Sequence, residues 1–375
     1  MDEACMYDVV IVGAGPAGST LARMVDKKYK VLIVDKRPFD ISDMDEKCCG
    51  GLLAPDAQKM LAELGLGVPK SVLSGPQMFS VKTLDFDNDL VRYYQRFYIN
   101  VNRNLFDKWL FDLIPDHVDK KINCCYKGYT IQEGTYKVTL KVREYDKNSS
   151  RMAMSDDNLV VRTKILIGAD GGNSAIRHQA FIGRPQPDTY LSIQKWYKTP
   201  RTMPFYTSIF DSSITDFYSW LIQKDQQLLI GTTIQKGKNP NTQYNRLIDR
   251  LVKEGYEIGE PVKQMGTVIL RTRKTKQIQL TKDGIGLIGE AAGLISPSSA
   301  EGISYAIKSA VYMADAINQK SVTFQKKYTK ACIGIKRNIW FKNIKTMVIY
   351  NRFFRKLVML SKILALKGNH HHSEK

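Results

Sequence analysis

The order of apolar runs and glycine-rich breaks along the chain predicts a parallel sheet covered by helices. Residues 7–12 (YDVVIV) are a short β-branched run of the kind that fills a buried parallel strand. A helical pattern follows at residues 19–25, and residues 30–34 (KVLIV) predict the next strand. Two later runs, at residues 166–174 and 284–293, again begin as strands, break at glycines and resume as helical patterns. This recurrence predicts one α/β domain assembled from distant segments.

A different pattern predicts a second domain. Residues 76–98 and 185–270 alternate apolar and polar positions in short runs separated by Asp, Asn, Gly and Pro, which is typical of antiparallel strands. Residues 129–161 predict a small hairpin layer of the first domain with a polar tip at 147–157. No long linker separates these regions, so we expect interleaved domains. The expected division is 1–75, 99–184 and 271–320 for the first domain, 76–98 and 185–270 for the second, and 321–375 for a helical tail.

The tail carries much of the positive charge of the chain. Of 56 Lys and Arg residues, 13 lie in 321–375, against 1 of 37 acidic residues. Apolar residues recur there at helical spacing between the basic ones: Trp340, Ile344, Met347, Val348, Phe354, Leu357, Val358 and Ile363. Such a basic amphipathic segment, 324–367, either lies on an anionic membrane or packs its apolar stripe on the first domain. No nucleic-acid-binding pattern is present, and we expect no such partner.

Composition excludes several classes of protein. Apolar residues make up 43% and charged residues 25% of the 375 positions, as in globular proteins and unlike disordered, collagen-like or coiled-coil chains. The six cysteines fit neither a zinc site nor a disulfide framework, so we expect no metal and reduced thiols. The start lacks a basic signal-peptide region, and no apolar run reaches 18 residues. We expect a cytoplasmic location, with peripheral contact at the inner face of the membrane as the alternative, and assign no function to His370–His372.

The first glycine-rich turn has the spacing G-x-G-x-x-G. Gly13 makes the tight turn, Gly15 lets the backbone approach a pyrophosphate, and Gly18 lets helix and strand pack closely. Asp35 ends the second strand, where a carboxylate accepts a hydrogen bond from an adenosine ribose. Strand, turn, helix, strand and acid in this order predict a dinucleotide site. Its expected lining also includes Pro16, Ala17 and Lys36.

Three segments together carry a resemblance to known flavoproteins. They are the turn at residues 13–18, Ala169-Asp170-Gly171, and Gly289-Glu290-Ala291-Ala292-Gly293 with its continuation to Ile303. They resemble the glutathione-reductase-type FAD fold of para-hydroxybenzoate-hydroxylase-like proteins, and most closely the geranylgeranyl reductase family, over residues 7 to about 310. The resemblance implies an α/β chain (α+β overall) in which a Rossmann-like three-layer FAD-binding domain is interleaved with an antiparallel-sheet substrate domain.

The resemblance also implies roles for single residues around FAD. Asp170 and Gly171 correspond to the Ala-Asp-Gly segment beside the pyrophosphate. Glu290 stands where the family has an aspartate that binds the ribityl chain, and Arg103 resembles an arginine that opens a helix and faces the cofactor. The planar fork of arginine suits phosphate oxygens.

The helix after Gly302 and Ile303 would point its positive end at the flavin, where the anion of the reduced ring is stabilised. Ala300 replaces the usual glycine in this loop.

Two further segments bear on the substrate. Cys49-Gly50-Gly51 resembles the Cys-Gly-Gly stretch of geranylgeranyl reductases, which implies a thiol and a tight backbone beside the flavin ring. Tyr218 and Trp220 resemble the Tyr-x-Trp-x-Phe-Pro motif that lines the lipid pocket, although Ile222 and Gln223 replace its phenylalanine and proline. Cys49, Tyr218 and water are the candidate proton donors.

These resemblances imply an FAD-dependent oxidoreductase that reduces carbon–carbon double bonds of a hydrophobic, isoprenoid-type substrate. The electron donor would be NADPH or NADH, or a ferredoxin-type protein. Two alternatives stay open: an FAD-dependent monooxygenase acting on a small aromatic or lipophilic substrate, and a non-catalytic, membrane-associated flavoprotein. A halogenase is disfavoured because residues 218–223 do not match the Trp-x-Trp-x-Ile-Pro segment of those enzymes.

Overall fold

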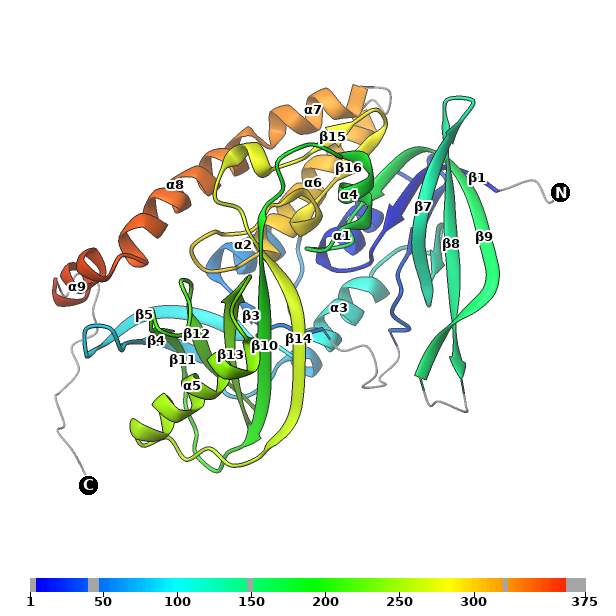
Figure 1. Ribbon diagram of the computed structural model, residues 1–375. Helices are drawn as coiled ribbons and strands as arrows, with labels where there is room; N and C mark the ends of the chain where they lie inside the picture. The colour runs from blue at the N-terminus through cyan, green and yellow to red at the C-terminus, as the bar shows by residue number, and fades with distance from the viewer. Residues whose placement is uncertain (1–4, 40–46, 147–150, 320–322, 362–375) are drawn as a thin grey trace.

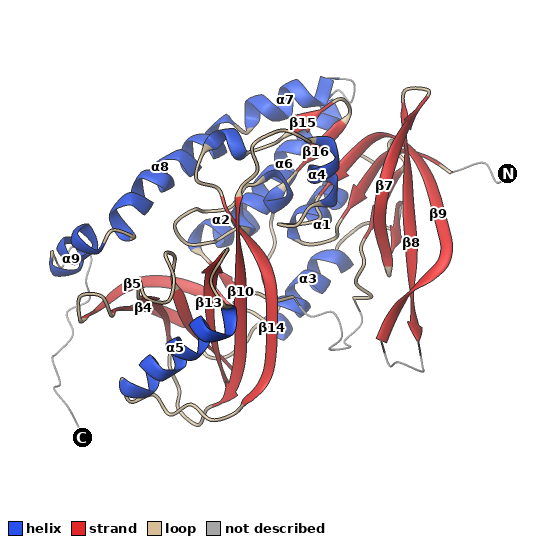
Figure 2. Ribbon diagram, in the orientation of Figure 1, coloured by secondary structure: helices blue, strands red, loops and turns tan. Residues whose placement is uncertain are grey.

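The chain folds around two sheets, as Figures 1 and 2 show for the computed structural model, which describes residues 5–39, 47–146, 151–319 and 323–361. In the first sheet β1 pairs in parallel with both β2 and β9, and β9 with β16. The order is β15 (Thr281–Lys282), β16 (Ile285–Leu287), β9 (Arg151–Gly168), β1 (Met6–Val12), β2 (Val31–Val34) and β6 (Val118–Lys121), with β8 (Thr135–Asp146) and β7 (Cys124–Gln132) continuing from β9.

The central strands of the first sheet pair in parallel and are apolar on both faces, as is usual for parallel strands covered on both sides. Val9, Ile11 and Leu32 are completely or almost completely buried. Helices α1 (Pro16–Met24) and α6 (Ile303–Gln319) pack against each other on one face, and the long strands β7, β8 and β9 form a further layer at the right of Figure 1. This arrangement confirms the predicted three-layer domain.

The second sheet runs beneath the first domain in Figure 1 and is largely antiparallel. Its order is β14 (Pro261–Arg271), β10 (Asp188–Lys198), β13 (Gln227–Gln235), β12 (Ser219–Lys224), β11 (Phe205–Phe210), β4 (Met78–Asp85), β5 (Leu90–Asn100) and β3 (Leu52–Leu53). One pair, β4 with β11, is parallel, whereas the other pairs of this sheet are antiparallel as expected. The two strands come from segments more than a hundred residues apart, so no hairpin turn dictates their direction.

A helix interrupts the region 185–270, where only strands were expected. In α5 (Pro240–Lys253) the Asn239 side chain caps the backbone N–H of Thr242, and Pro240 occupies the first turn. Tyr244, Leu247 and Leu251 follow at helical spacing and pack on one face of the sheet. The aromatic residues on the opposite face of the sheet pack in the interior between the two domains.

Short helices complete the first domain. They are α2 (Pro55–Glu63), α3 (Arg103–Asp112) and α4 (Ala175–Ala180), with single 3₁₀ turns at Lys70–Val72, Thr275–Gln277 and Gly289–Ala292. Helix α3 begins directly after Asn102, whose side chain accepts hydrogen bonds from the backbone of Asn104 and Leu105. This cap fixes the position of Arg103 as the first helical residue.

The tail forms three helices, α7 (Phe324–Ala331), α8 (Ile333–Ile349) and α9 (Arg352–Leu360), that run along one edge of the molecule (Figure 1). Tyr328 and Ile339 are buried against the first domain. At the far end Arg355 of α9 pairs with Asp85 at the end of β4, at 2.8 Å between Nε and Oδ2, and both side chains are buried. Residues 362–375, with Ile363 and His370–His372, lie outside the described residues. No helix within the described segments is long and apolar enough to cross a bilayer.

Candidate cofactor and substrate site

A cavity of about 1650 Å³ is lined by both sheets and by the helical tail. Every residue that the sequence nominated for cofactor or substrate lines it, except Gly18. The ends of β1, β2 and β9 supply one region of the wall, and the inner face of the second sheet supplies another. The carboxyl ends of parallel strands are where ligands bind in open α/β sheets.

The first glycine turn has the geometry that a pyrophosphate needs. Gly13 has φ +103°, and a Cβ built there would lie 2.4 Å from the carbonyl oxygen of Ala169. A Cβ on Gly18 would lie 1.8 Å from the carbonyl oxygen of Gly13, so helix and turn pack without side chains. A Cβ on Gly15 would meet nothing within 4 Å, because this residue faces the open cavity. Backbone N–H groups at the start of α1 therefore border empty space of the right kind for phosphate oxygens.

Asp35 accepts several hydrogen bonds from the protein itself, which the sequence did not predict. Its Oδ2 accepts the backbone N–H of Ala14 at 2.7 Å, and its Oδ1 accepts the backbone N–H of Arg37 at 2.8 Å. The Arg37 guanidinium adds contacts to both oxygens. A carboxylate has about four acceptor positions, so a ribose hydroxyl would have to share Asp35 with Arg37. The arginine two residues after the acid was the signal for this arrangement.

Arg37 and Arg103 both form ion pairs with the buried carboxylate of Asp107. Nη1 of Arg37 lies 2.7 Å from Oδ2 of Asp107, and Nε of Arg103 lies 2.7 Å from Oδ1 of the same side chain. Asp107 is 1% exposed. This pairing turns the Arg103 guanidinium toward the cavity and links the end of β2 to α3. The i,i+4 spacing of Arg103 and Asp107 was visible in the sequence, whereas the contact with Arg37 spans 70 positions.

Two carboxylates lie on the far wall of the cofactor region. Oδ2 of Asp170 accepts the backbone N–H of Ile176, but its buried Oδ1 has no hydrogen-bond partner within the described segments. Burial raises the pKa of Asp170. Oε1 of Glu290 accepts the backbone N–H of Leu270 at 3.3 Å. The residues present fit FAD because the glycine turn leaves open space at Gly15, beside backbone N–H groups that suit a pyrophosphate.

The loop before α6 is held from two sides. Tyr218 donates its O–H to the carbonyl of Ser299 at 2.7 Å, and Tyr350 of the tail donates to the carbonyl of Ser298 at 2.7 Å. Ala300 adopts φ +51°, the left-handed conformation in which a glycine is usual. The chain therefore keeps the loop path despite the alanine, and Gly302 and Ile303 line the cavity at the start of α6.

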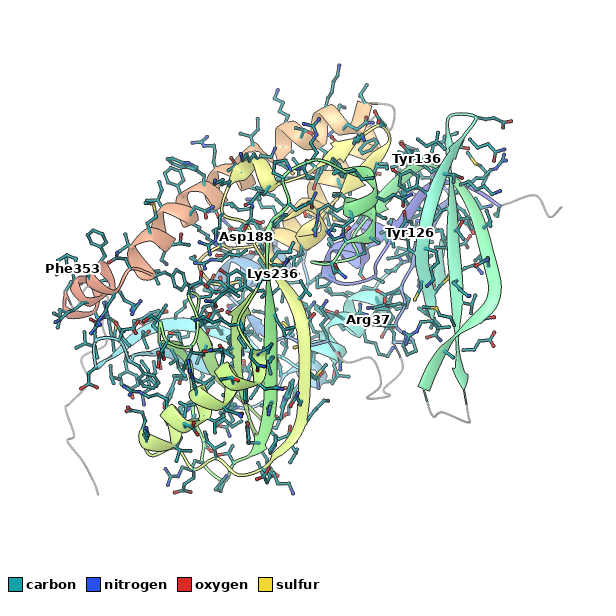
Figure 3. All side chains as sticks on the ribbon, viewed as in Figure 1. Arg37, Tyr126, Tyr136, Asp188, Lys236 and Phe353 are labelled. Atoms are coloured by element: carbon teal, nitrogen blue, oxygen red, sulfur yellow. The ribbon has the colours of Figure 1, made fainter. Side chains whose placement is uncertain are left out.

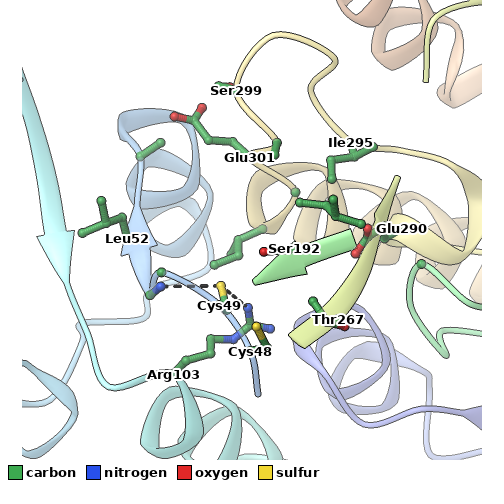
Figure 4. Close-up of a pocket in the computed structure, with 18 of the residues that line it drawn as sticks. Cys48, Cys49, Leu52, Arg103, Ser192, Thr267, Glu290, Ile295, Ser299 and Glu301 are labelled. Atoms are coloured by element: carbon green, nitrogen blue, oxygen red, sulfur yellow. Dashed lines mark hydrogen bonds between the residues drawn. The ribbon is translucent and has the colours of Figure 1, made fainter. Parts of the chain in front are cut away.

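Cys49 lies at the centre of Figure 4, between Arg103 and its own loop. Its Sγ is 3.2 Å from Nη1 of Arg103 and 3.5 Å from the backbone nitrogen of Gly51. Gly51 has φ +60°, and a Cβ there would lie 2.4 Å from the carbonyl oxygen of Val101. A Cβ on Gly50 would lie 2.7 Å from Cδ1 of Ile222. Cys48 and Cys49 are both free thiols, and burial raises the pKa of Cys48 to about 12.

Lys224, which the sequence analysis did not single out, holds the Cys49–Gly51 loop by hydrogen bonds. Its Nζ donates to the carbonyls of Gly51 at 3.0 Å and Val101 at 2.8 Å, and also to the side-chain oxygen of Asn100. Burial lowers its pKa to about 7. The contact spans 173 positions, so local pattern could not reveal it.

Aromatic residues line the second region of the cavity. Trp220 lies directly over Gly231, where a Cβ would be 2.4 Å from the indole ring, and Tyr218 packs beside it. At the rim, Glu301 accepts the O–H of Tyr98 at 2.9 Å and pairs with Arg96. The site thus joins a dinucleotide cradle to an aromatic chamber with a charged rim.

Comparison with known proteins agrees with this arrangement. A family model described as FAD binding domain matches residues 126–320. Protein CbrA of Escherichia coli O6:H1 is 34% identical over 355 residues, covering 95% of this chain and 93% of its own. Protein CbrA of Shigella sonnei is also 34% identical, covering 95% and 96%.

Solved structures show the same fold at low sequence identity. A geranylgeranyl bacteriochlorophyll reductase-like protein from Thermoplasma acidophilum has a TM-score of 0.80 at 21% identity, over 96% of this chain and 91% of that one. The flavin-dependent brominase Bmp2 has a TM-score of 0.67 at 19% identity, over 95% and 92%. With the sequence matches, these findings make the chain a member of the FAD-binding domain family and, across 95% of its length, of the CbrA family.

Proposed function

We propose that this flavoprotein reduces carbon–carbon double bonds of a hydrophobic, isoprenoid-type substrate. The observation that carries the proposal is the position of the Cys49–Gly51 loop, which lies in the wall of one continuous cavity between the glycine turn and the aromatic chamber. The volume of about 1650 Å³ exceeds the roughly 300–1000 Å³ of an ordinary small-molecule pocket, so it accommodates a second molecule beside a dinucleotide.

The wall of the aromatic chamber supports a hydrophobic substrate. Its lining includes Tyr206, Phe210, Tyr218, Trp220, Ile222 and Tyr350. Large planar side chains exclude water and pack on unsaturated hydrocarbon. A protein described as geranylgeranyl bacteriochlorophyll reductase-like shares the fold, which adds support for a prenyl-type substrate.

Reduced FAD, when bound, supplies a hydride to one alkene carbon. The chain must then deliver a proton to the other carbon. We assign this proton to Cys49, because Arg103 and the Gly51 backbone both donate to its sulfur and so direct its S–H away from themselves. Tyr218 acts as a positioning residue, because its O–H is engaged by Ser299 and burial raises its pKa. The electron donor is proposed to be NADPH or NADH near Asp170, or a ferredoxin-type protein.

Mass spectrometry of a polyprenyl lipid pool tests the proposal. The holoenzyme is reduced with dithionite and incubated with the pool without oxygen and, separately, with oxygen. We expect mass gains in units of two hydrogens under anaerobic conditions. Cys49→Ala should lower the rate at least a hundredfold, within the range for loss of a general acid, whereas Cys5→Ala, at an exposed thiol, should not change it.

Other outcomes overturn the proposal. Incorporation of oxygen only in the aerated sample would assign the chain to the monooxygenases. No mass change, with tight FAD that no donor reduces, would favour a non-catalytic flavoprotein. A full rate in Cys49→Ala would remove the proton-donor role but leave the reduction itself standing.

A further inference from the structure

Helices α8 and α9 expose many large apolar side chains. They recur at helical spacing on α8 and continue on α9: Ile333, Trp340, Phe341, Ile344, Met347, Val348, Phe353, Phe354, Leu357, Val358 and Leu360. Met347 is 73% and Phe353 64% exposed, and Figure 3 shows Phe353 at the outer edge of the molecule. Large exposed apolar patches mark interaction sites. We call these residues the apolar ridge.

The exposed position of the ridge contradicts one of the two alternatives from the sequence, in which the apolar stripe of the tail packs on the first domain. The apolar positions between Trp340 and Val358 that were expected to form a stripe are all on the exposed side. A separate set, including Cys332, Ile335 and Ile339, makes the contact with the first domain. The helices are therefore apolar both where they pack and where they face solvent, and only the first of these faces is accounted for by the fold.

The charged residues of the tail helices themselves are all basic. Residues 323–361 contain no Asp or Glu. Four basic residues of the same run of helices are exposed, and we call them the basic rim: Lys330 of α7, Arg337 of α8, and Arg352 and Lys356 of α9. A basic rim around an apolar face is complementary to anionic lipid headgroups over hydrocarbon, whereas a nucleic acid would leave the apolar face without a partner.

The same helices form part of the cavity wall. Lys342, Lys345, Val358 and Met359 line the cavity, while Trp340, Met347 and Leu357 on the same two helices face outward. Val358 belongs both to the ridge and to the cavity lining, so the ridge reaches the cavity at α9. A molecule held in a lipid surface at the ridge lies next to the cavity lining.

We propose that α8 and α9 dock the protein on an anionic lipid bilayer, with the apolar ridge in the interface and the basic rim at the headgroups. Delivery of a hydrophobic substrate from the bilayer to the adjacent cavity follows if the proposed function holds. The docking itself does not rest on that function.

Sedimentation of the holoenzyme with vesicles tests the docking. Vesicles of phosphatidylcholine with 30% phosphatidylglycerol, chosen as about one anionic lipid in three, are compared with pure phosphatidylcholine. A ridge variant carries Trp340→Ser, Met347→Ser and Phe353→Ser. A rim variant carries Lys330→Gln, Arg337→Gln and Lys356→Gln. A matched control removes exposed apolar residues elsewhere, with Ile131→Ser, Ile182→Ser and Val252→Ser.

We expect the wild-type protein and the matched control to bind the anionic vesicles equally. The ridge variant should lose binding, and the rim variant should bind roughly a hundredfold more weakly, because each near-surface base contributes about fivefold. Bound FAD, read from its absorbance, and an unchanged melting temperature would show that the variants are folded.

Three results would overturn the proposal: no vesicle binding by wild type, equal binding by the ridge variant, or equal loss in the matched control. A dimer that the ridge variant dissociates, without vesicle binding, would assign the ridge to a second copy of the chain. Vesicle binding with no lipid reduction would leave the docking standing and reject the proposed function alone.

Discussion

Arg103 contacts Cys49 with its Nη1, at 3.2 Å from the sulfur, while its Nε pairs with Asp107 at 2.7 Å. One guanidinium therefore connects the buried carboxylate of α3 to the loop that borders the aromatic chamber. Replacing Arg103 by Met should lower the free energy of unfolding by about 3 kcal/mol, because Asp107 is buried and keeps only Arg37. Urea unfolding of FAD-free protein measures this loss. Arg103→Lys retains the charge and should lose less, and equal stability of Arg103→Met and wild type would contradict the network.

The glycine turn permits a sharp contrast between two substitutions. Gly15→Ala should leave the stability of FAD-free protein unchanged but weaken FAD binding at least tenfold, because its new Cβ enters the cavity and meets no protein atom. Gly13→Ala should lower stability by 2 kcal/mol or more, since φ is +103° and the new Cβ meets Ala169 at 2.4 Å, a cost of about the size that misplaced glycine substitutions bring. Fluorescence titration with FAD and thermal melts of the FAD-free proteins separate the two effects. Parallel losses of stability in both variants would argue against an open space above Gly15.

Lys224 predicts a dependence of stability on pH. Its pKa is about 7 in the folded chain and about 10.4 when unfolded, so between these values the unfolded chain holds one more proton. The contribution of Lys224 to the free energy of unfolding therefore rises as pH increases from 7 to 10 and is smallest below 7. Lys224→Met removes this rise and takes away the donor that serves the Val101 carbonyl and the Asn100 side-chain oxygen, at a cost of about 1–3 kcal/mol.

Urea unfolding at pH 6 and pH 9 checks this expectation. The variant should be less stable than wild type at pH 9, and the gap should narrow at pH 6. Lys236→Met, at an exposed lysine, serves as the control and should show no such change between the two pH values. A gap that stays constant would mean that Lys224 titrates normally.

Ala300 offers a stabilising substitution. Its φ of +51° costs an L-residue about 1 kcal/mol that glycine does not incur. Ala300→Gly should raise the melting temperature, with a net gain below about 1 kcal/mol because glycine also gains freedom in the unfolded chain. Ala62→Gly within α2 should act in the opposite direction. Calorimetry measures the melting temperatures of both variants. A lower melting temperature for Ala300→Gly would show that the alanine methyl group packs favourably in the loop.

The sequence was informative where chemistry is local. The fold class followed from strands that end at glycines, because the turn at residues 13–18 and the buried run at residues 7–12 each restrict their own segment. FAD as cofactor followed from the same turns and agrees with the family match. The residues nominated around them remain predictions of contact, although all but Gly18 line one cavity.

Features built by distant segments were not visible in this way. Lys224 reaches Gly51 across 173 positions, and Arg37 reaches Asp107 across 70, so no spacing rule links them. The parallel pairing of β4 with β11 arises where two separate hairpin systems meet. Helix α5 was missed for a different reason: its cap at Asn239 and its apolar spacing were present but were grouped with the surrounding strands.

The ion pair between Arg355 and Asp85 fixes the last of the C-terminal helices to the second sheet. A chain shortened before α9 would leave Asp85, a fully buried carboxylate, without this arginine, at a cost of about 3–5 kcal/mol. Truncation would therefore damage the sheet that shapes the chamber, and it would not yield a working enzyme that merely lacks a tail. The C-terminal helices are held in one position relative to both sheets. A surface that binds these helices would therefore fix the orientation of the whole molecule.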